Sequence, residues 1–535
     1  MPVKKSVPLI LIVATLLMMV FFSSSLLYSK GISEEEIYIL DRDKTFVIVY
    51  PKGEDEPLID PFVASDELSL LILEGLFEGL YRVEHETGNA VQAIAEHVEV
   101  SEDGLTWTFD IYNDATFSNG DPITAKVFVD SWLHLLESSS PRAQKSYLVS
   151  LFDVIKGAKE YRTGDGKRSD VGIHEKSKFT LEVLLNNKAP YLSSLLTNVT
   201  FAAIHPDTYK QRNQNLIFSG AYTLSNLSKE EILLEKNTNY REASSVNNDY
   251  VEILIRDDLE AIESYLNKEA HWLLSYVPPQ LLRTRSDLHL SKIYATGFFY
   301  FSAKDGPYSD ARVRKAISLI TPWDEIRNNS GQLFPSATLI PSSGSILKKT
   351  KVVTTDSQEE AKRLLNLAGF SSFNDLPPLN MAIHRGAPIQ ETAMSLALSW
   401  SNTLTIPVIV DTVPLSLYTR YPRENPYDVS YITWVADFND PFAFLPLFGS
   451  SSSYNIANYS NKEYDTLLEK AVNSNNEEER KIAIEAAEAT LLEEAIIFPI
   501  HSGFSIHIVD SEVVKGWYDN TINIHPLRSL ELIER

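Results

Sequence analysis

The spacing of apolar residues along the chain predicts a mixture of strands and helices. A continuous apolar run over residues 46–50 is typical of a buried strand. Apolar residues alternate with polar ones over residues 105–111 and 179–185, which predicts strands with one buried face. Over residues 68–80 the apolar positions recur at helical spacing, which predicts an amphipathic helix. The alternation of these two periods indicates an α/β protein.

Two segments in the second half have the spacing of a capping box, which marks a helix start. Ser357 and Ser460 are each followed three residues later by a glutamate, Glu360 and Glu463. In such a box the serine accepts a hydrogen bond from the first helical turn, and the glutamate reaches back to the serine's backbone N–H. We therefore expect helices to begin at both serines. The pattern also predicts strands at 251–255, 298–301, 496–500 and 504–509, and helices at 124–136, 312–320 and 476–494.

The first 30 residues have the pattern of an export signal. Lys4 and Lys5 precede an apolar run over residues 7–27. This run is about as long as the roughly 20 residues that a membrane-spanning helix needs. Two alternatives therefore stay open, a cleaved signal peptide and an uncleaved N-terminal anchor. Both alternatives predict that the rest of the chain is exported to a periplasmic or other extracytoplasmic location.

Composition and charge exclude several classes of function. The chain has 72 Asp and Glu against 48 Lys and Arg, a net charge of −24, whereas nucleic-acid binding needs clustered cations. No cysteine is present, which excludes disulfides, thiolate metal sites and cysteine nucleophiles. Apolar residues make up 44% of 535 residues, enough for a large core, so chain-wide disorder is not expected.

Sequence motifs for catalysis, metals and cofactors are nearly absent. The chain contains no HExxH, no phosphate-binding GxxxxGK[ST] and no GxSxG nucleophile motif. Ser345 and Lys348 have the SxxK spacing of Ser/Lys acyl-transfer enzymes, but the companion KTG motif is missing. We therefore expect a protein that is not an enzyme and that needs no cofactor or metal. A Ser/Lys hydrolase at Ser345 remains a remote alternative.

One acidic residue, Asp437, stands in an unusual setting. It follows the apolar and aromatic segment 432–436, which is typical of a strand. A carboxylate buried there is costly unless it meets a cation, which favours a role in binding. Asn439 and Pro441 follow closely, so a turn or helix-capping aspartate fits the pattern equally well. From the residues alone, both interpretations stay open.

Longer blocks of the sequence resemble the peptide-binding proteins of ABC importers, of the oligopeptide and dipeptide family 5 type. The first such block runs from LFEGLYRV through WTFDIYNDATFSNGDPITAKVFVDSW, over residues 76–132. The segments WVADFNDPFAFLPLF and NYSNKEYDTLLEKA, at 434–448 and 458–471, are similar to a signature stretch of that family. Further blocks that occur in the family's order are SGAYTL, DARVRKAIS and KRLLNLAGF. The resemblance extends from about residue 46 to residue 530.

The resemblance implies a bilobed α/β fold of the periplasmic-binding type (type II, Venus-flytrap), enlarged by an inserted domain. The lobes are expected to close over an oligopeptide and deliver it to the permease subunits of an ABC transporter, with the protein itself a monomer. The alternative is a receptor or sensor of the same fold for a specialised ligand, such as a murein-derived or modified peptide. The expected domains are a signal or anchor at 1–30, lobe I at 31–80, 198–291 and 500–535, the inserted domain at 81–197, and lobe II at 292–499.

The resemblance also implies a peptide-binding site. Asp437 matches the aspartate that pairs with the α-ammonium group of the peptide. The strand before it, Thr433 to Val435, is expected to pair its backbone with the extended ligand. The other candidate peptide-binding residues are Trp434, Ala436, Ser275, Tyr276, Arg420, Tyr431, Ser65, Asp66 and Glu67.

Three positions depart from the pattern of the family's best-known peptide binders. Tyr431 stands where those proteins have an arginine, Ile389 aligns roughly with a histidine, and Val413 lies near an aromatic position. The histidine is expected to contact the carboxylate of longer ligands. The family's preference for ligand length therefore does not carry over to this chain, which keeps the specialised ligand open as an alternative.

Overall fold

The computed structural model describes most of the chain from residue 41 onward. The described ranges are 41–52, 57–64, 66–137, 147–210, 216–274, 286–341, 355–384, 387, 389–414, 424–452, 454–474 and 476–533. Several predictions lie outside these ranges, namely those for residues 1–30, Ser65, Ser275, Tyr276, Ser345 and Arg420. Residues Asp43–Arg535 belong to one compact unit. No helix within the described ranges is long and apolar enough to cross a membrane.

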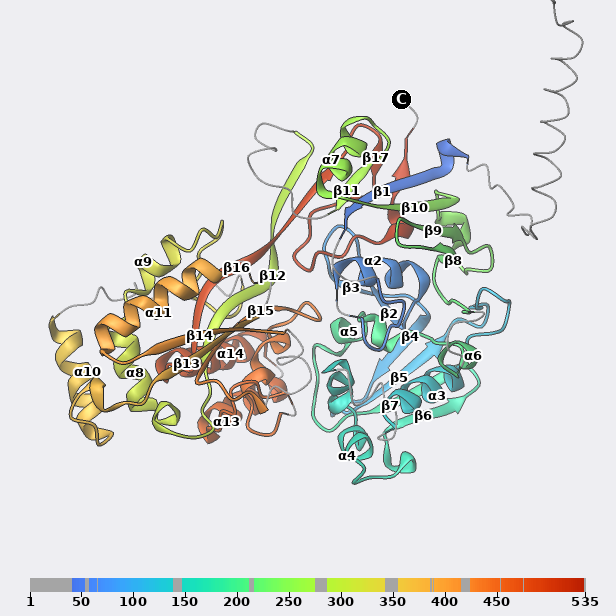
Figure 1. The fold of residues 1–535 in the computed structure, drawn as a ribbon. Helices are drawn as coiled ribbons and strands as arrows, with labels where there is room; N and C mark the ends of the chain where they lie inside the picture. The colour runs from blue at the N-terminus through green and yellow to red at the C-terminus, as the bar shows by residue number, and fades with distance from the viewer. Residues whose placement is uncertain are drawn as a thin grey trace, which may run out of the picture. The chain divides into compact units, whose positions relative to one another are not determined.

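A mixed sheet of ten strands runs through the described part of the unit Asp43–Arg535 (Figure 1). Its first strand, β1 (Thr45–Pro51), matches the apolar run of the sequence and lies between two parallel neighbours, β10 and β11. The order across the sheet is β14 (Val408–Val413), β13 (Leu379–His384), β15 (Val429–Val435), β12 (Leu288–Phe301), β16 (Ile497–Val509), β11 (Trp272–Leu274), β1, β10 (Tyr250–Arg256), β9 (Glu231–Lys236) and β8 (Tyr222–Leu227).

The long antiparallel strands β12 and β16 connect the two ends of this sheet (Figure 1). At one end β16 pairs with β11, and at the other end β12 pairs with β15. The sequence pattern predicted two strands over 496–509, but the structure has one continuous strand there. The predicted strand at 298–301 is likewise only the end of a 14-residue strand. The predicted lobe limits at 291/292 and 499/500 fall within these two strands, and the domain limits stay a prediction.

A second sheet lies within residues 81–197, the segment predicted as an inserted domain. Its four antiparallel strands are β4 (Ala95–Val100), β5 (Thr106–Ile111), β7 (Thr180–Leu184) and β6 (Ile173–Ser177). Helix α3 (Ala125–Leu135) packs against β6 and β7, with Phe128 and Trp132 buried. Two-stranded pairs also form between β2 (Tyr81–Val83) and β3 (Ala90–Gln92), and between β17 (Val514–Lys515) and β18 (Glu531–Leu532).

The helices confirm most of the predicted helical segments but correct both capping boxes. Helix α10 begins at Thr355, so Ser357 lies inside it. Helix α13 is capped by Asn461, whose side chain accepts bonds from the backbone of Glu463 and Tyr464. Asparagine caps helices as well as serine does, and it stands one residue after Ser460. In the described part of the chain the α-helices are α2 (Glu67–Leu76), α3, α4 (Ala158–Thr163), α5 (Leu192–Leu195), α6 (Pro206–Lys210), α7 (Asp258–Leu266), α8 (Ala311–Leu319), α9 (Trp323–Asn328), α10 (Thr355–Leu367), α11 (Gln390–Leu404), α13 (Lys462–Asn473) and α14 (Glu477–Glu493).

Apolar side chains from these helices bury against both ends of the large sheet. Val313 of α8 and Trp400 of α11 share one core cluster with Met381 of β13. At the other end Tyr265 of α7 shares a cluster with Val47 of β1. Burial of large side chains in this way supplies most of the favourable free energy of folding. The core therefore fixes each end of the sheet, and β12 and β16 pass between them.

Gly297 lets two side chains approach β12 closely, and we expect its replacement to be strongly destabilising. A Cβ atom at Gly297 would overlap with Nε2 of His501 and with the hydroxyl of Tyr431. Those two atoms are hydrogen-bonded at 2.8 Å, and both residues are buried. Gly297→Ala must therefore displace the pair, at an expected cost of about 2–3 kcal/mol in the free energy of unfolding, measured by urea denaturation.

Gly449→Ala is the matched control, because a Cβ at Gly449 would make only ordinary contacts of 3.5 Å or more. Its φ of −66° also suits any residue. An equal loss of stability in both variants would contradict the role given to Gly297.

Candidate functional site

A cavity of about 480 Å³ lies against the carboxyl end of β15. The end of β15 contributes Val435, Ala436 and Asp437 to its lining, and the first two turns of α2 contribute residues between Glu67 and Glu74. Strands β11, β12 and β16 contribute Trp272, Leu274, Ile293, Phe504, Ser505 and Ile506. The rest of the lining comes from two segments outside the large sheet, residues 197–199 and 522–525, which include Asn523 and His525. Its volume lies within the roughly 300–1,000 Å³ that is usual for ligand sites.

Asp437 occupies a special position, because it borders this cavity and a second cavity of about 420 Å³. Its backbone carbonyl accepts a 3.4 Å hydrogen bond from Nδ2 of Asn198. The pKa of neighbouring Tyr454 is raised chiefly by burial and further by the charges of Tyr300 and Asp437. The capping role that the sequence left open falls to Asp440, whose Oδ1 accepts a 2.9 Å bond from the backbone of Phe442.

One edge of β15 has no partner strand over most of its length, within the ranges that the structure describes. Strand β12 pairs with β15 along its whole length on one side. On the other side β13 reaches only Val429 and Ser430, which leaves 431–435 without a described strand neighbour. The side chain of Val435 is 52% exposed. Such an edge offers backbone N–H and C=O groups to an added strand.

Of the other predicted residues on β15, Trp434 borders the second cavity, whereas Thr433 and Tyr431 border neither cavity. Trp434 is 7% exposed, and its indole N–H donates a 2.8 Å bond to the carbonyl of Ala443. The hydroxyls of Thr433 and Tyr431 are 2.9 Å apart and hydrogen-bonded. Tyr431 is fully buried, which raises its pKa, and it borders neither cavity. Instead it meets His501 beneath Gly297.

Asp66 and Glu67, at the start of α2, have different roles. Asp66 caps the helix, because its Oδ1 accepts a 2.9 Å bond from the backbone of Ser69. Glu67 borders the cavity, and its Oε1 accepts a 2.9 Å bond from Nδ2 of Asn523. The residue is exposed toward the cavity, but the protein packed around its carboxyl group raises its pKa, and the bond from Asn523 opposes this rise.

Sequence reasoning missed Glu74, which borders the same cavity. Its Oε2 atom is buried without a hydrogen-bond partner. Burial raises the pKa of this carboxyl group to about 7, although the charges of Arg528 and Arg82 act in the opposite direction. The available signal was an acidic residue inside the mostly apolar segment 68–77.

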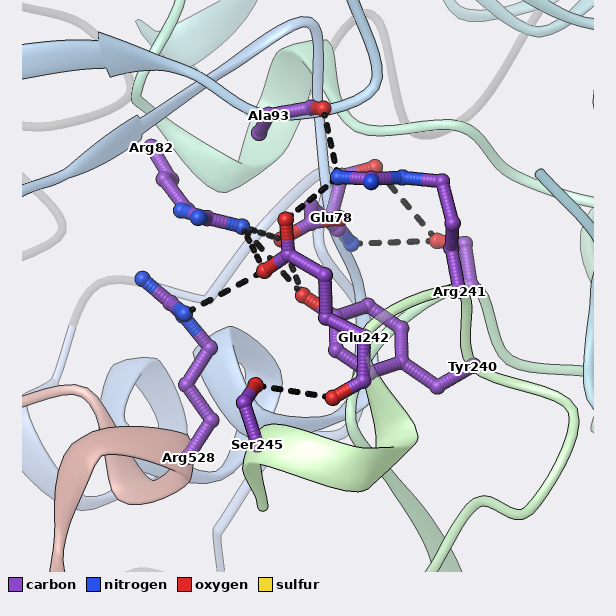
Figure 2. Close-up of polar contacts among 9 residues, drawn as sticks. Glu78, Arg82, Ala93, Tyr240, Arg241, Glu242, Ser245 and Arg528 are labelled. Carbon is purple, nitrogen blue, oxygen red and sulfur yellow. Dashed lines mark hydrogen bonds and ion pairs between the residues drawn. The ribbon is translucent and has the colours of Figure 1, made fainter. Parts of the chain in front are cut away.

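An ion-pair network lies next to the end of α2 (Figure 2). Arg82 contacts Glu78 at 3.1 Å and Glu242 at 2.8 Å, and Arg528 approaches Glu242 at 3.6 Å. The hydroxyl of Tyr240 donates a 2.6 Å bond to Glu78. Both arginines thus pair with other carboxylates, and neither forms an ion pair with Glu74 among the described contacts.

The lining of the second cavity includes three aromatic rings, in which Tyr191 stacks on both Phe438 and Phe442. The ring of Tyr191 lies 5.4 Å from that of Phe438 and 5.0 Å from that of Phe442, with interplanar angles of 15°. Lys159 and Lys188 also line this cavity, so it carries both signs of charge. Asp437 therefore lies at the junction of an anionic and a mixed cavity.

Comparison with known proteins assigns this geometry to a family. The model for bacterial extracellular solute-binding proteins, family 5 (Middle), matches residues 89–455, more than half of the chain. The oligopeptide-binding protein OppA of Bacillus subtilis is 26% identical over 484 residues, which cover 86% of this chain and 87% of that protein. The periplasmic murein peptide-binding protein MppA of Escherichia coli is 27% identical over 499 residues, covering 87% and 88%.

Solved structures confirm the predicted fold. Haemophilus influenzae OppA in complex with the peptide RPPGFSPFR is 25% identical and matches with a TM-score of 0.75, covering 92% of this chain and all of the other. A periplasmic oligopeptide-binding protein of Borrelia burgdorferi, also 25% identical, matches with a TM-score of 0.76, covering 91% and 100%. The fold is the bilobed α/β fold of these binding proteins. The chain therefore belongs to the bacterial extracellular solute-binding proteins of family 5.

Proposed function

We propose that the protein binds peptides in the cavity beside β15 and delivers them to the permease of an ABC importer outside the cytoplasmic membrane. The observation that carries this proposal is the placement of Asp437 at the end of a strand whose outer edge lacks a described partner. A free peptide has a backbone that can pair with that edge and an ammonium group at one end. The named relatives of the chain that bind oligopeptides support the proposal.

The mechanism follows from these groups. The peptide lies along 431–435 as an added strand, so every peptide can use the same backbone hydrogen bonds. Its α-ammonium group pairs with Asp437, and this charge-assisted bond fixes the direction of the ligand. Because the lining includes residues on α2, β11, β12, β15 and β16, a bound ligand contacts both ends of the large sheet. If the ligand makes these contacts to both lobes only in the closed form, its binding shifts the equilibrium from the open to the closed form.

A receptor for murein-derived or modified peptides is the second candidate. The similarity to the murein peptide-binding protein of Escherichia coli is about as strong as that to the oligopeptide binders, at 27% against 26% identity. Tyr431 stands where the family's best-known peptide binders have an arginine, and it is buried. This difference favours another way of binding the C-terminal end of the ligand. Both candidate functions use Asp437 in the same way, so identification of the bound ligand is needed to distinguish them.

Native mass spectrometry of the purified protein, followed by denaturation and sequencing of released molecules, tests the proposal. We expect a mixture of peptides with free N-termini, because the backbone edge and Asp437 recognise groups common to all peptides. A single species that contains murein amino acids would favour the specialised candidate instead. A protein that is empty, and that shows no heat of binding with a pool of peptides in calorimetry, would contradict peptide binding.

A further inference from the structure

We propose that the cavity beside β15 binds a second positive charge of the ligand, carried by a lysine- or arginine-type side chain, at Glu74. This inference rests on the proposed function and narrows the ligand class to cationic peptides. It concerns a different group from the α-ammonium at Asp437. Its support comes from the charge balance of the cavity and from the state of the Glu74 carboxyl group.

The described lining of this cavity has acidic residues but no lysine or arginine. Among the described residues that line it, Glu67, Glu74 and Asp437 are the acids, and there is no lysine or arginine. His525 also lines the cavity, but burial lowers its pKa well below the ordinary value, so it is neutral. An α-ammonium group at Asp437 pairs with only one of these three acidic residues. The remaining carboxylates, both on α2, lack a compensating cation in the lining.

Glu74 is the more unusual of these two carboxylates. Its Oε2 is buried without a hydrogen-bond partner, whereas Glu67 accepts a bond from Asn523. A buried acceptor without a donor costs about 1–3 kcal/mol, and more when it is charged. Arg82 and Arg528 line a smaller adjoining cavity together with Glu74, but the ion pairs that they form are with Glu78 and Glu242 (Figure 2). The protein thus retains an unsatisfied acid at the wall of its ligand cavity.

The surroundings of Glu74 suit a long cationic side chain better than a small ion. Leu70 and Leu71 on the same helix, and Leu274 and Ile506 on the sheet, line the cavity with apolar surface. The aliphatic part of lysine or arginine packs on such surface while its charged end reaches a carboxylate. Glu67 and Glu74 are seven residues apart and so lie on one face of α2, about two turns or roughly 10 Å apart. We assign the cation to Glu74, because Glu67 already accepts a hydrogen bond from Asn523 and Oε2 of Glu74 accepts none.

Calorimetry at pH 8 with paired peptides tests the inference. The peptides have free N-termini, are built of alanine, and carry either lysine or its uncharged analogue norleucine at one position, which is moved along the peptide. We expect lysine to bind at least tenfold more tightly than norleucine at one position. In Glu74→Gln the ratio at that position should fall close to one, because the amide offers no charge. Glu99→Gln, which removes an exposed acid on β4, should keep the wild-type ratio.

The possible outcomes separate this inference from the proposed function. If both peptide series bind the wild type equally at every position, the second cation site is wrong and peptide binding stands. If neither series binds, the proposed function fails. If lysine is preferred and Glu74→Gln keeps that preference, the assignment to Glu74 is wrong. The ratio of lysine to norleucine affinities in the wild type tests whether a second cation site exists, even if a variant does not fold.

Discussion

Asp437→Asn should weaken the binding of a free-amine peptide about 100-fold, which corresponds to about 3 kcal/mol. The carboxylate borders both cavities and sits beside an open strand edge, where water is displaced when a peptide pairs with the strand. Asparagine keeps the size and a carbonyl oxygen but loses the charge. The peptide ammonium then remains desolvated without its partner, which is the costly situation for a buried charge. Calorimetry with a short unmodified peptide measures the change.

The same peptide with an acetylated N-terminus separates the charge effect from a general loss of structure. Acetylation removes the cation, so wild type and Asp437→Asn should bind the acetylated peptide with affinities within about threefold. Asp114→Asn makes the same chemical change at an exposed turn residue and should alter neither affinity. Equal losses for free and acetylated peptides in Asp437→Asn would show that Asp437 does not pair with the ammonium group.

Local pattern predicted most strands and helices because each depends on near neighbours along the chain. The alternating segments became β5 and β7, and the apolar run at 46–50 became β1. The break predicted between residues 500 and 504 was wrong, because β16 is continuous over Ile497–Val509. In the structure Gly503 packs against Ala295, where a Cβ would clash with that side chain. That glycine therefore permits close strand packing, which only the partner strand could show.

The candidate site was only partly predictable for a related reason. Asp437 could be found, because a single acid after an aromatic strand is visible in a short window. The same cavity is lined by residues far apart in the sequence, namely Glu74, Asn523 and His525. Their meeting depends on how α2 and the C-terminal segment pack, which local periodicity does not encode. The sequence pattern placed Glu74 only within the helix predicted over 68–80, whereas the fold buries its Oε2 atom.

Glu74 also links binding to stability. A carboxyl group kept unsatisfied in the folded protein lowers stability until something positive arrives. Such a cost is common at binding sites, where the ligand completes the arrangement that the protein leaves incomplete. If this holds here, removing the charge should make the ligand-free protein more stable. The pH dependence of that gain is the specific signature.

Glu74→Gln should raise the free energy of unfolding at pH 8 by about 3 kcal/mol more than it does at pH 4. Burial raises the pKa of Glu74 from 4.5 to about 7 in the folded protein. Below the unfolded value both states carry the proton, and the raised pKa costs nothing. As the pH rises from 4.5 toward 7, the unfolded chain ionises first, so stability falls, and above 7 the cost is complete. Glutamine does not titrate, so the variant escapes this loss, as urea denaturation at pH 4, 6 and 8 would show.

The control is Glu99→Gln, whose exposed position predicts no pH-dependent difference from wild type. A gain in Glu74→Gln that is the same at pH 4 and pH 8 would mean that burial does not raise the pKa of the carboxyl group.

The same stability measurements with bound peptide test whether the ligand's cation reaches Glu74. With a saturating lysine peptide the wild type gains its missing cation, so its deficit at pH 8 relative to Glu74→Gln should shrink, whereas the norleucine peptide should leave the deficit in place. A deficit that shrinks equally with both peptides would place the ligand's cation away from Glu74.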